Sequence, residues 1–199
     1  MADDSPADPA ASPLAAQPNR EWHVRLIVED PATGAQDRNT VLGQLLQAQV
    51  GYDPNDLVEL PPFATPSLTL LFPHPDWKVK GDRPPRGRPP TGNFDPGDPP
   101  SRGSAHRDWQ DKSGDYASDF RPARGNQPMT WNLELRADPA PAEVILRWEG
   151  PADILRRSQL TDTLTGQTIN PASPSSASGL PVHLTGTVRR FTWRYLGGR

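Results

Sequence analysis

Between residues 37 and 59, several acidic and amide side chains have the chemistry of cation ligands. They are Asp37, Asn39, Asp53, Asn55, Asp56 and Glu59. Oxygen-rich loops suit Ca²⁺, which takes about six to eight oxygen ligands. The residues after Asp53 do not match an EF-hand loop, because glycine and a terminal glutamate are missing at the required offsets. Asp and Asn also shape turns by accepting hydrogen bonds from nearby backbone N–H groups. The cluster therefore predicts either a calcium site or a set of polar turns.

The sequence contains no recognisable catalytic motif. The histidines are His23, His74, His106 and His183, and no two of them have metal-ligand spacing. A Gly-x-Ser-x-Gly nucleophile motif is absent, and nothing singles out two carboxylates for glycoside hydrolysis. The chain has no cysteine, which excludes disulfides, thiol catalysis and Cys-ligated metals. We therefore expect no enzymatic activity and no cofactor apart from the calcium alternative; a hydrolase is a distant third function.

A proline- and arginine-rich stretch, residues 73–115, carries the candidate contact residues. They are Trp77, Arg83, Arg86, Arg88, Phe94 and Trp109. Arginine and aromatic side chains are common hot spots of protein interfaces, and a proline-rich segment loses little entropy on docking. The aromatic rings are also suited to stacking on sugars, and the arginines to keeping a solvated polyproline-like loop soluble. This stretch predicts contact with a protein partner or self-association, with polysaccharide binding as the alternative.

Composition and charge exclude other classes of protein. The 199 residues include 26 prolines, against roughly 10 at average usage, which argues against a helical bundle. With 24 acidic and 21 basic residues the net charge is −3, and the isoelectric point is near 5.8. Nucleic-acid-binding domains usually have isoelectric points above about 9, so we expect no nucleic acid partner. No apolar run reaches the roughly 20 residues of a membrane-spanning helix.

Alternating apolar and polar residues indicate strands along most of the chain. The alternation is strongest at 22–28, 129–136 and 144–148. Shorter strands are expected at 67–72, 116–121, within 154–164, and at 167–169, 182–184 and 189–196. Residues 40–50 fit a short helix and a strand equally well. The run 138–141 between two strong strands predicts a hairpin loop.

These elements predict an all-β fold, an antiparallel β-sandwich of seven to nine strands. Residues 1–20 form the expected flexible tail, and residues 21–199 form a single domain with 73–115 as an insertion. The alternation places Trp22, Trp131, Trp148 and Trp193 on strand faces, so we expect them to pack in the core.

Several short motifs follow one another in a distinctive order after an opening strand with Trp22. They are Asp37-x-Asn39-x-x-Leu42-Gly43, Ala48-x-x-Gly51-Tyr52-Asp53, Asp56-x-x-Glu59-x-Pro61-Pro62, Tyr116-x-x-Asp119-Phe120-Arg121, Trp131-x-Leu133, Val144-x-Leu146-x-Trp148, Leu160-x-Asp162-x-x-x-Gly166 and Arg190-Phe191-Thr192-Trp193. Over residues 21–199 this order resembles the immunoglobulin-like β-sandwich modules near the C-termini of large secreted and surface proteins of environmental bacteria. The resemblance implies a non-catalytic spacer, anchor or assembly element.

We therefore expect an exported bacterial protein with a structural or assembly role, such as a surface-layer, filament or adhesion subunit. A carbohydrate-binding module that uses Trp77, Trp109 and Phe94 is the alternative. The first residues have neither the basic nor the apolar region of a signal peptide. The chain is then either cytosolic or a mature form whose signal has been removed, and we expect the second, with an extracellular or cell-surface location.

Overall fold

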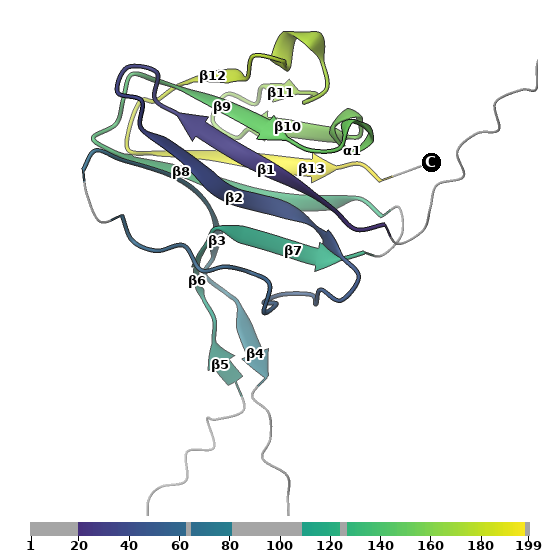
Figure 1. Ribbon diagram of the computed structural model, residues 1–199. Helices are drawn as coiled ribbons and strands as arrows, with labels where there is room; N and C mark the ends of the chain where they lie inside the picture. Colours follow the sequence, from purple (N-terminus) through teal and green to yellow (C-terminus); the bar gives the residue numbers. More distant parts are fainter. Residues whose placement is uncertain (1–19, 63–64, 81–108, 124–126, 198–199) are drawn as a thin grey trace, which may run out of the picture.

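The computed structural model describes residues 20–62, 65–80, 109–123 and 127–197. Within these ranges the chain forms two packed β-sheets, one short α-helix and a separate two-stranded ribbon (Figure 1). The predicted β-sandwich is confirmed at this level. The predicted tail lies outside the described residues except for Arg20. No helix of the described part is long and apolar enough to cross a bilayer.

The first sheet has five strands in the order β12–β9–β1–β2–β7. Its strands are β1 (Trp22–Glu29), β2 (Gln36–Leu45), β7 (Ser118–Pro122), β9 (Glu143–Glu149) and β12 (Leu180–His183). Helix α1 (Ala152–Arg156) and a 3₁₀ turn (Pro174–Ser176) lie in the connections between later strands. Strand β1 pairs antiparallel with both β2 and β9, so it forms the middle of this sheet.

The second sheet has six strands in the order β11–β10–β13–β8–β3–β6. Its strands are β3 (Ser67–His74), β6 (Gly114–Tyr116), β8 (Met129–Asp138), β10 (Ser158–Asp162), β11 (Thr168–Ile169) and β13 (Val188–Tyr195). The ribbon pairs β4 (Lys78–Lys80) with β5 (Trp109–Asp111). Strand β6 therefore ends the sheet on the side from which the ribbon emerges.

The described ranges contain thirteen strands, more than the seven to nine expected. Strands β4, β5, β6 and β11 each have only two or three residues. Alternation cannot be recognised over so few positions. These short strands account for the difference.

Residues 40–45 continue strand β2, so the helical alternative for this stretch is wrong. Gly43 supplies a physical reason. A Cβ atom there would lie 2.3 Å from the carbonyl oxygen of Trp22 and 2.9 Å from the Cα of His23. The missing side chain lets β1 and β2 approach closely, and the leucine spacing that resembled a helix face places Leu42 in the core while Leu46 is exposed.

In the described part of the chain one pair of neighbouring strands is parallel, which corrects the prediction of a wholly antiparallel sandwich. Strand β7 runs parallel to β2, with Val41 opposite Ser118 and Leu45 opposite Pro122. Parallel pairing requires a connection of about a dozen residues or more. The chain between β2 and β7 is long enough because it passes through the second sheet and the ribbon before it returns.

The hairpin predicted at 138–141 is also wrong. Strand β8 belongs to the six-stranded sheet and β9 to the five-stranded sheet, so this loop connects the two layers. Alternation reveals which face of a strand is buried. It does not reveal the partner strand, and the short loop can connect two sheets as readily as two paired strands.

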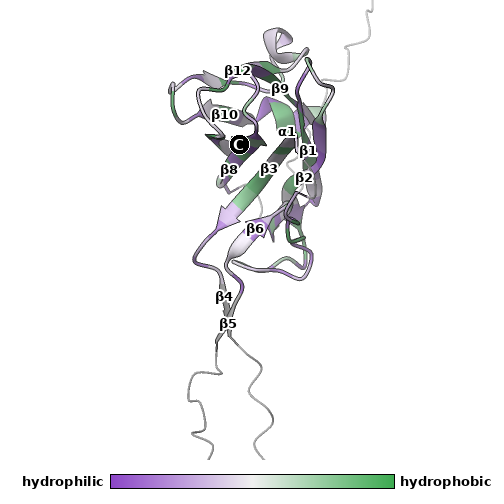
Figure 2. Cartoon of the chain, turned by 90° about the vertical axis from the view of Figure 1, so that its left-hand side faces the viewer, coloured by the Kyte–Doolittle hydropathy of each residue, from purple (hydrophilic) through white to green (hydrophobic). Residues whose placement is uncertain are grey.

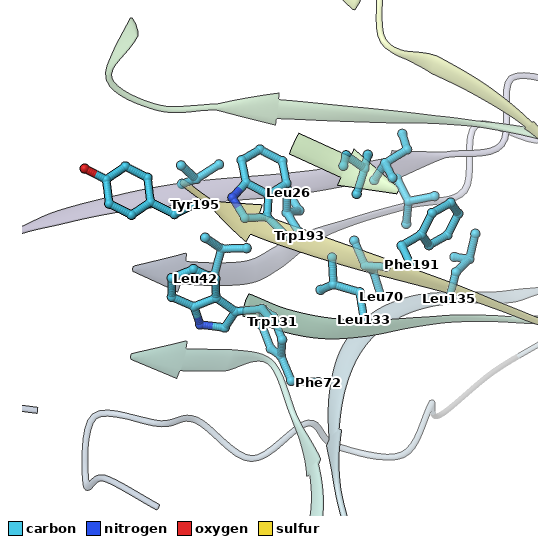
Figure 3. Packing of buried hydrophobic residues seen from close by; sticks show 14 of the residues in the cluster. Leu26, Leu42, Leu70, Phe72, Trp131, Leu133, Leu135, Phe191, Trp193 and Tyr195 are labelled. Carbon is cyan, nitrogen blue, oxygen red and sulfur yellow. The ribbon is translucent and has the colours of Figure 1, made fainter. Parts of the chain in front are cut away.

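The core lies between the sheets and is built around tryptophans (Figure 3). Trp22, Trp131 and Trp193 are buried, and the rings of Trp22 and Trp131 meet edge to face with centroids 5.8 Å apart. Their buried neighbours include Leu26, Leu42, Leu70, Phe72, Leu133, Leu135, Phe191 and Tyr195. Trp148 is half-buried against this core, and its indole N–H donates to the carbonyl of Pro171 at 2.8 Å. The core prediction is confirmed for the first three tryptophans and in part for Trp148.

Candidate functional site

A projecting hairpin arm begins at the edge of the six-stranded sheet. Residues 72–74 of β3 pair antiparallel with 114–116 of β6, and β4 then pairs antiparallel with β5. The chain advances four residues from His74 to Lys78 but three from Asp111 to Gly114. Residues 75–76 form a turn between the two paired regions, so the ribbon is a separate sheet that continues the chain beyond β3 and β6. The predicted insertion 73–115 therefore leaves and re-enters the sandwich as paired strands.

In Figures 1 and 2 the ribbon extends away from the sandwich, below the end of β3 and β6. We call residues 72–80 and 109–116 the arm root, and residues 81–108 the arm tip. The predicted contact residues Arg83, Arg86, Arg88 and Phe94 belong to the arm tip and lie outside the described residues. Trp109 is the first residue of β5 and Trp77 immediately precedes β4. The candidate contact residues thus divide between a root that the structure describes and a tip beyond it.

Aromatic rings pack around the arm root. Trp77 stacks on His74 with centroids 3.5 Å apart and planes inclined by 12°. Tyr116 lies 4.8 Å from Trp77 in a tilted arrangement, and Tyr52 lies 6.3 Å from it edge to face. Aromatic pairs of this kind contribute about 0.5–1.5 kcal/mol each beyond the burial of their area. Trp77 is therefore half-buried in the molecule's own root, with one face covered by His74.

Lys112 connects the two strands of the arm root. Its backbone N–H donates to the carbonyl of Trp77 at 2.9 Å, and its own carbonyl accepts a 2.6 Å hydrogen bond from the hydroxyl of Tyr116. Its ammonium group lies 5.1 Å from the centre of the Tyr52 ring, within cation–π range. The first contact joins the outgoing and returning strands, and the other two hold Lys112 against Tyr116 and Tyr52.

A buried ion-pair network lies beneath the root. Nε2 of His74 is 3.0 Å from Oδ2 of Asp119, although its N–H is not aligned for a hydrogen bond. Arg121 donates to both oxygens of Asp119, at 3.2 and 3.1 Å. Burial acts to raise the pKa of Asp119, but His74 and Arg121 outweigh it and hold that pKa below its usual value. The carboxylate of Asp119 therefore remains charged although it is only 1 % exposed.

The predicted cation ligands around residue 53 form turns. The carboxylate of Asp53 accepts backbone N–H bonds from Gln49 and Asn55, at 2.8 and 2.9 Å. That of Asp56 accepts them from Asp53 and Phe120, at 2.7 and 2.8 Å. These contacts fix the loop against β7 and agree with the turn interpretation. Burial raises the pKa of Asp56 to about 7, assisted by the charges of Asp119 and Asp53 and opposed by its backbone hydrogen bonds.

The remaining predicted ligands lie apart from this loop. Asp37, on β2, accepts N–H bonds from Asn39 at 2.9 Å and from Leu70 of the other sheet at 2.8 Å. Asn39 is exposed, and Glu59 lines a groove on the outside of the sandwich. Among the described residues, no three His, Cys, Asp or Glu side chains are grouped to hold a metal ion. Calcium binding stays a prediction.

Sequence reasoning missed a groove of about 830 Å³ on the outer face of the six-stranded sheet. Thr69 and Leu71 of β3 and Arg136 of β8 line it. Its lining also includes the segment 59–62, Asp115, Asp138 and Val188. Leu60 is 62 % exposed and Val188 43 % exposed. The exposure of these apolar side chains, beside Pro61 and Pro62, marks this surface. The sequence does not reveal the groove, because its residues come together only in the folded chain.

The charges of the groove are unevenly compensated. Arg136 donates to Glu134 at 2.7 Å and forms a two-fold ion pair with Asp115. The carboxylate of Glu59 has no hydrogen bond or ion pair with another described residue. Burial raises the pKa of Glu59, with the charges of Asp37 and Asp115 acting in the same direction. The groove thus contains a carboxyl group that lacks a cationic partner within the described chain.

Comparison with protein-family models, with curated proteins and with solved structures gives no match for this chain. The function is therefore argued from the geometry of the arm, its root and the groove.

Proposed function

We propose that this protein is a non-catalytic, exported structural or assembly subunit that acts through protein–protein contacts made by its arm. The observation that carries the proposal is the arm root, whose paired strands β4 and β5 extend away from the sandwich. We further propose that the sandwich is an immunoglobulin-like module of a bacterial cell surface, on the basis of its motif order and its two packed sheets.

The construction of the root supports a contact role for the arm. A two-stranded ribbon alone is only marginally stable in water. Here the stacking of Trp77 on His74 and the hydrogen bonds of Lys112 reinforce it where it leaves the sheet. A reinforced root directs the ribbon away from the body up to Lys80 and Trp109. The arginines and Phe94 of the arm tip have the chemistry of an interface. The stability of the sandwich alone does not require a ribbon that extends beyond its sheets.

The shifted carboxyl group of Asp56 does not favour catalysis. A pKa near 7 is typical of a general acid or base. Asp56, however, is only 4 % exposed, and its two oxygens accept the N–H groups of Asp53 and Phe120. The geometry therefore favours a structural role for this group. We keep the hydrolase as a distant third function.

Shortening the arm tests the proposal. In the arm-shortened variant, a two-residue Asn-Gly turn replaces residues 81–108. It connects Lys80 to Trp109, and these two residues are paired opposite each other in the ribbon. We expect the full chain to associate with increasing concentration in sedimentation velocity, and the variant to sediment as a monomer. A second variant with a Gly/Ser linker of the original length controls for chain length. If the full chain stays monomeric and binds no envelope component, the proposal is wrong.

Carbohydrate binding is the alternative function, through Trp77, Trp109 and Phe94. Trp77 already uses one ring face to stack on His74, which leaves less of it for a sugar. Titration with a panel of polysaccharides tests this alternative through tryptophan fluorescence. Unchanged fluorescence across the panel would exclude it.

A further inference from the structure

We propose that the groove on the outer face of the six-stranded sheet is the docking site for residues 83–90 of a second copy's arm. This inference rests on the proposed function and deepens it, because it names the surface that receives the arm. The groove is an exposed hollow beside the arm root, and its lining combines apolar side chains with carboxylates.

The groove carries uncompensated negative charge. The groove is lined by the carboxylates of Glu59, Asp115 and Asp138, and Arg136 is its basic side chain. Asp115 and Glu134 already neutralise that arginine. Glu59 is half-buried and unpaired among the described residues, so a guanidinium group entering the groove would gain a partner and relieve an uncompensated charge.

The arm tip supplies the matching chemistry. Residues 83–90 read Arg-Pro-Pro-Arg-Gly-Arg-Pro-Pro, with three arginines and no acidic residue. Prolines favour an extended backbone that spans about 3.1 Å per residue and is already ordered before docking. Their rings fit the exposed apolar wall of Leu60, Pro61 and Val188. An arginine- and proline-containing strand therefore complements both the charge and the apolar surface of the groove.

The direction of the arm argues for a second copy. Asp115, in the groove, lies at the root, and β5 lies further out along the ribbon. From Lys80, at the outer end of the ribbon, Arg83 is three residues away, a reach of roughly 10 Å. At Lys80, the last described residue of the outgoing strand, the ribbon leads away from the groove beside Asp115. A neighbouring molecule is thus better placed to receive residue 83, and two molecules can exchange arms symmetrically.

A peptide titration tests the site directly. A synthetic peptide of residues 81–92 is titrated calorimetrically into the arm-shortened variant, whose groove is empty of its own tip. We expect binding that weakens with added salt. The double variant Glu59→Gln with Asp138→Asn should weaken it at least tenfold, as should a peptide with its three arginines replaced by glutamine.

The controls separate lost docking from unfolding. Glu59→Gln removes a half-buried, unpaired charge, so it should leave the melting temperature unchanged or raise it. Glu149→Gln, on an exposed side chain of the other sheet, should leave peptide binding unchanged. Absence of peptide binding, or binding unaffected by the groove variants, overturns the inference.

The test also distinguishes the inference from the proposed function. If arm shortening abolishes self-association but the groove variants of the full chain still associate normally, the assembly role stands and this docking site is wrong. If the peptide binds but the full chain remains monomeric, the segment occupies its own groove, and docking between copies is wrong.

Discussion

Neighbouring buried carboxyl groups beneath the arm root have pKa values shifted in opposite directions. Asp119 is held below its usual pKa by His74 and Arg121 despite its burial, whereas burial raises the pKa of Asp56 to about 7. The lowered group stabilises the fold above its unfolded pKa, and this contribution is lost as the pH falls through the folded value. The raised group stabilises the fold below its unfolded pKa near 4, and this contribution is lost as the pH rises through 7.

Asp56→Asn should therefore change how stability depends on pH. Between pH 4 and 7 Asp56 is protonated in the folded chain and ionised in the unfolded chain. Its contribution therefore lowers the free energy of unfolding by about 1.4 kcal/mol for each unit by which the pH rises. In the variant this contribution disappears, so the curve should be flatter over that range. Urea unfolding at a series of pH values measures the difference. Parallel curves for the two proteins would show that Asp56 does not titrate near neutrality.

Gly43→Ala tests the close approach of β1 and β2. The added methyl group would lie 2.3 Å from the carbonyl oxygen of Trp22, a backbone atom that cannot move freely. We expect a loss of about 1–3 kcal/mol in the free energy of unfolding. Gly186→Ala is the matched control, because nothing lies within 4 Å of its added Cβ, and should change stability by less than about 0.5 kcal/mol. Equal effects of the two substitutions would contradict this packing.

At the scale of elements, a few contacts between aromatic rings stabilise the arm root against the sandwich. Trp77→Ala removes the stacking on His74 and the packing against Tyr116. We expect a loss of about 2 kcal/mol in overall stability and a selective rise in hydrogen exchange at the backbone amides of β4 and β5. Trp148→Ala is a matched control, since Trp148 is also half-buried but lies on β9. Unchanged exchange in the ribbon of the Trp77 variant would mean that the ribbon does not depend on this cluster.

The elements also show which structural information the sequence carries. Strands β1, β8, β9 and β13 are recognisable because each buries alternate side chains, a pattern written in consecutive residues. The arm root is not recognisable in this way, since its paired strands are only three residues long and stand in a proline-rich context. Pairing between β2 and β7 depends on residues more than seventy positions apart. Such partners follow from the packing of the whole sheet and leave no local pattern.

In the candidate site, too, the sequence reveals local features but not contacts between distant segments. The carboxylates of Asp53 and Asp56 were recognisable as turn residues, and the arginines of the tip as contact residues. The pairing of His74 with Asp119, and the grouping of Glu59, Arg136 and Val188 around one groove, join strands that are distant in sequence. Only the folded chain brings them together.

At the scale of the whole molecule, we propose that the sandwich supports an arm and a groove that receives the arm of a second copy. Nine of the 26 prolines lie in the arm, residues 72–116, where they favour an extended contact segment. If self-association joins the arginines of the arm tip to the carboxylates of the groove, it should weaken with rising salt. Sedimentation velocity at a series of salt concentrations measures this, and salt-independent association would point to a different interface.

A photo-cross-linking measurement tests the central claim, contact between the arm and a second copy, most directly. Phe94 of the full chain is replaced by the photoreactive amino acid p-benzoyl-phenylalanine, and light and heavy isotope-labelled chains are mixed before irradiation. We predict cross-linked peptides that join the arm tip of one isotope form to the body of the other. Cross-links that join only residues of the same chain, even at high protein concentration, would contradict the account.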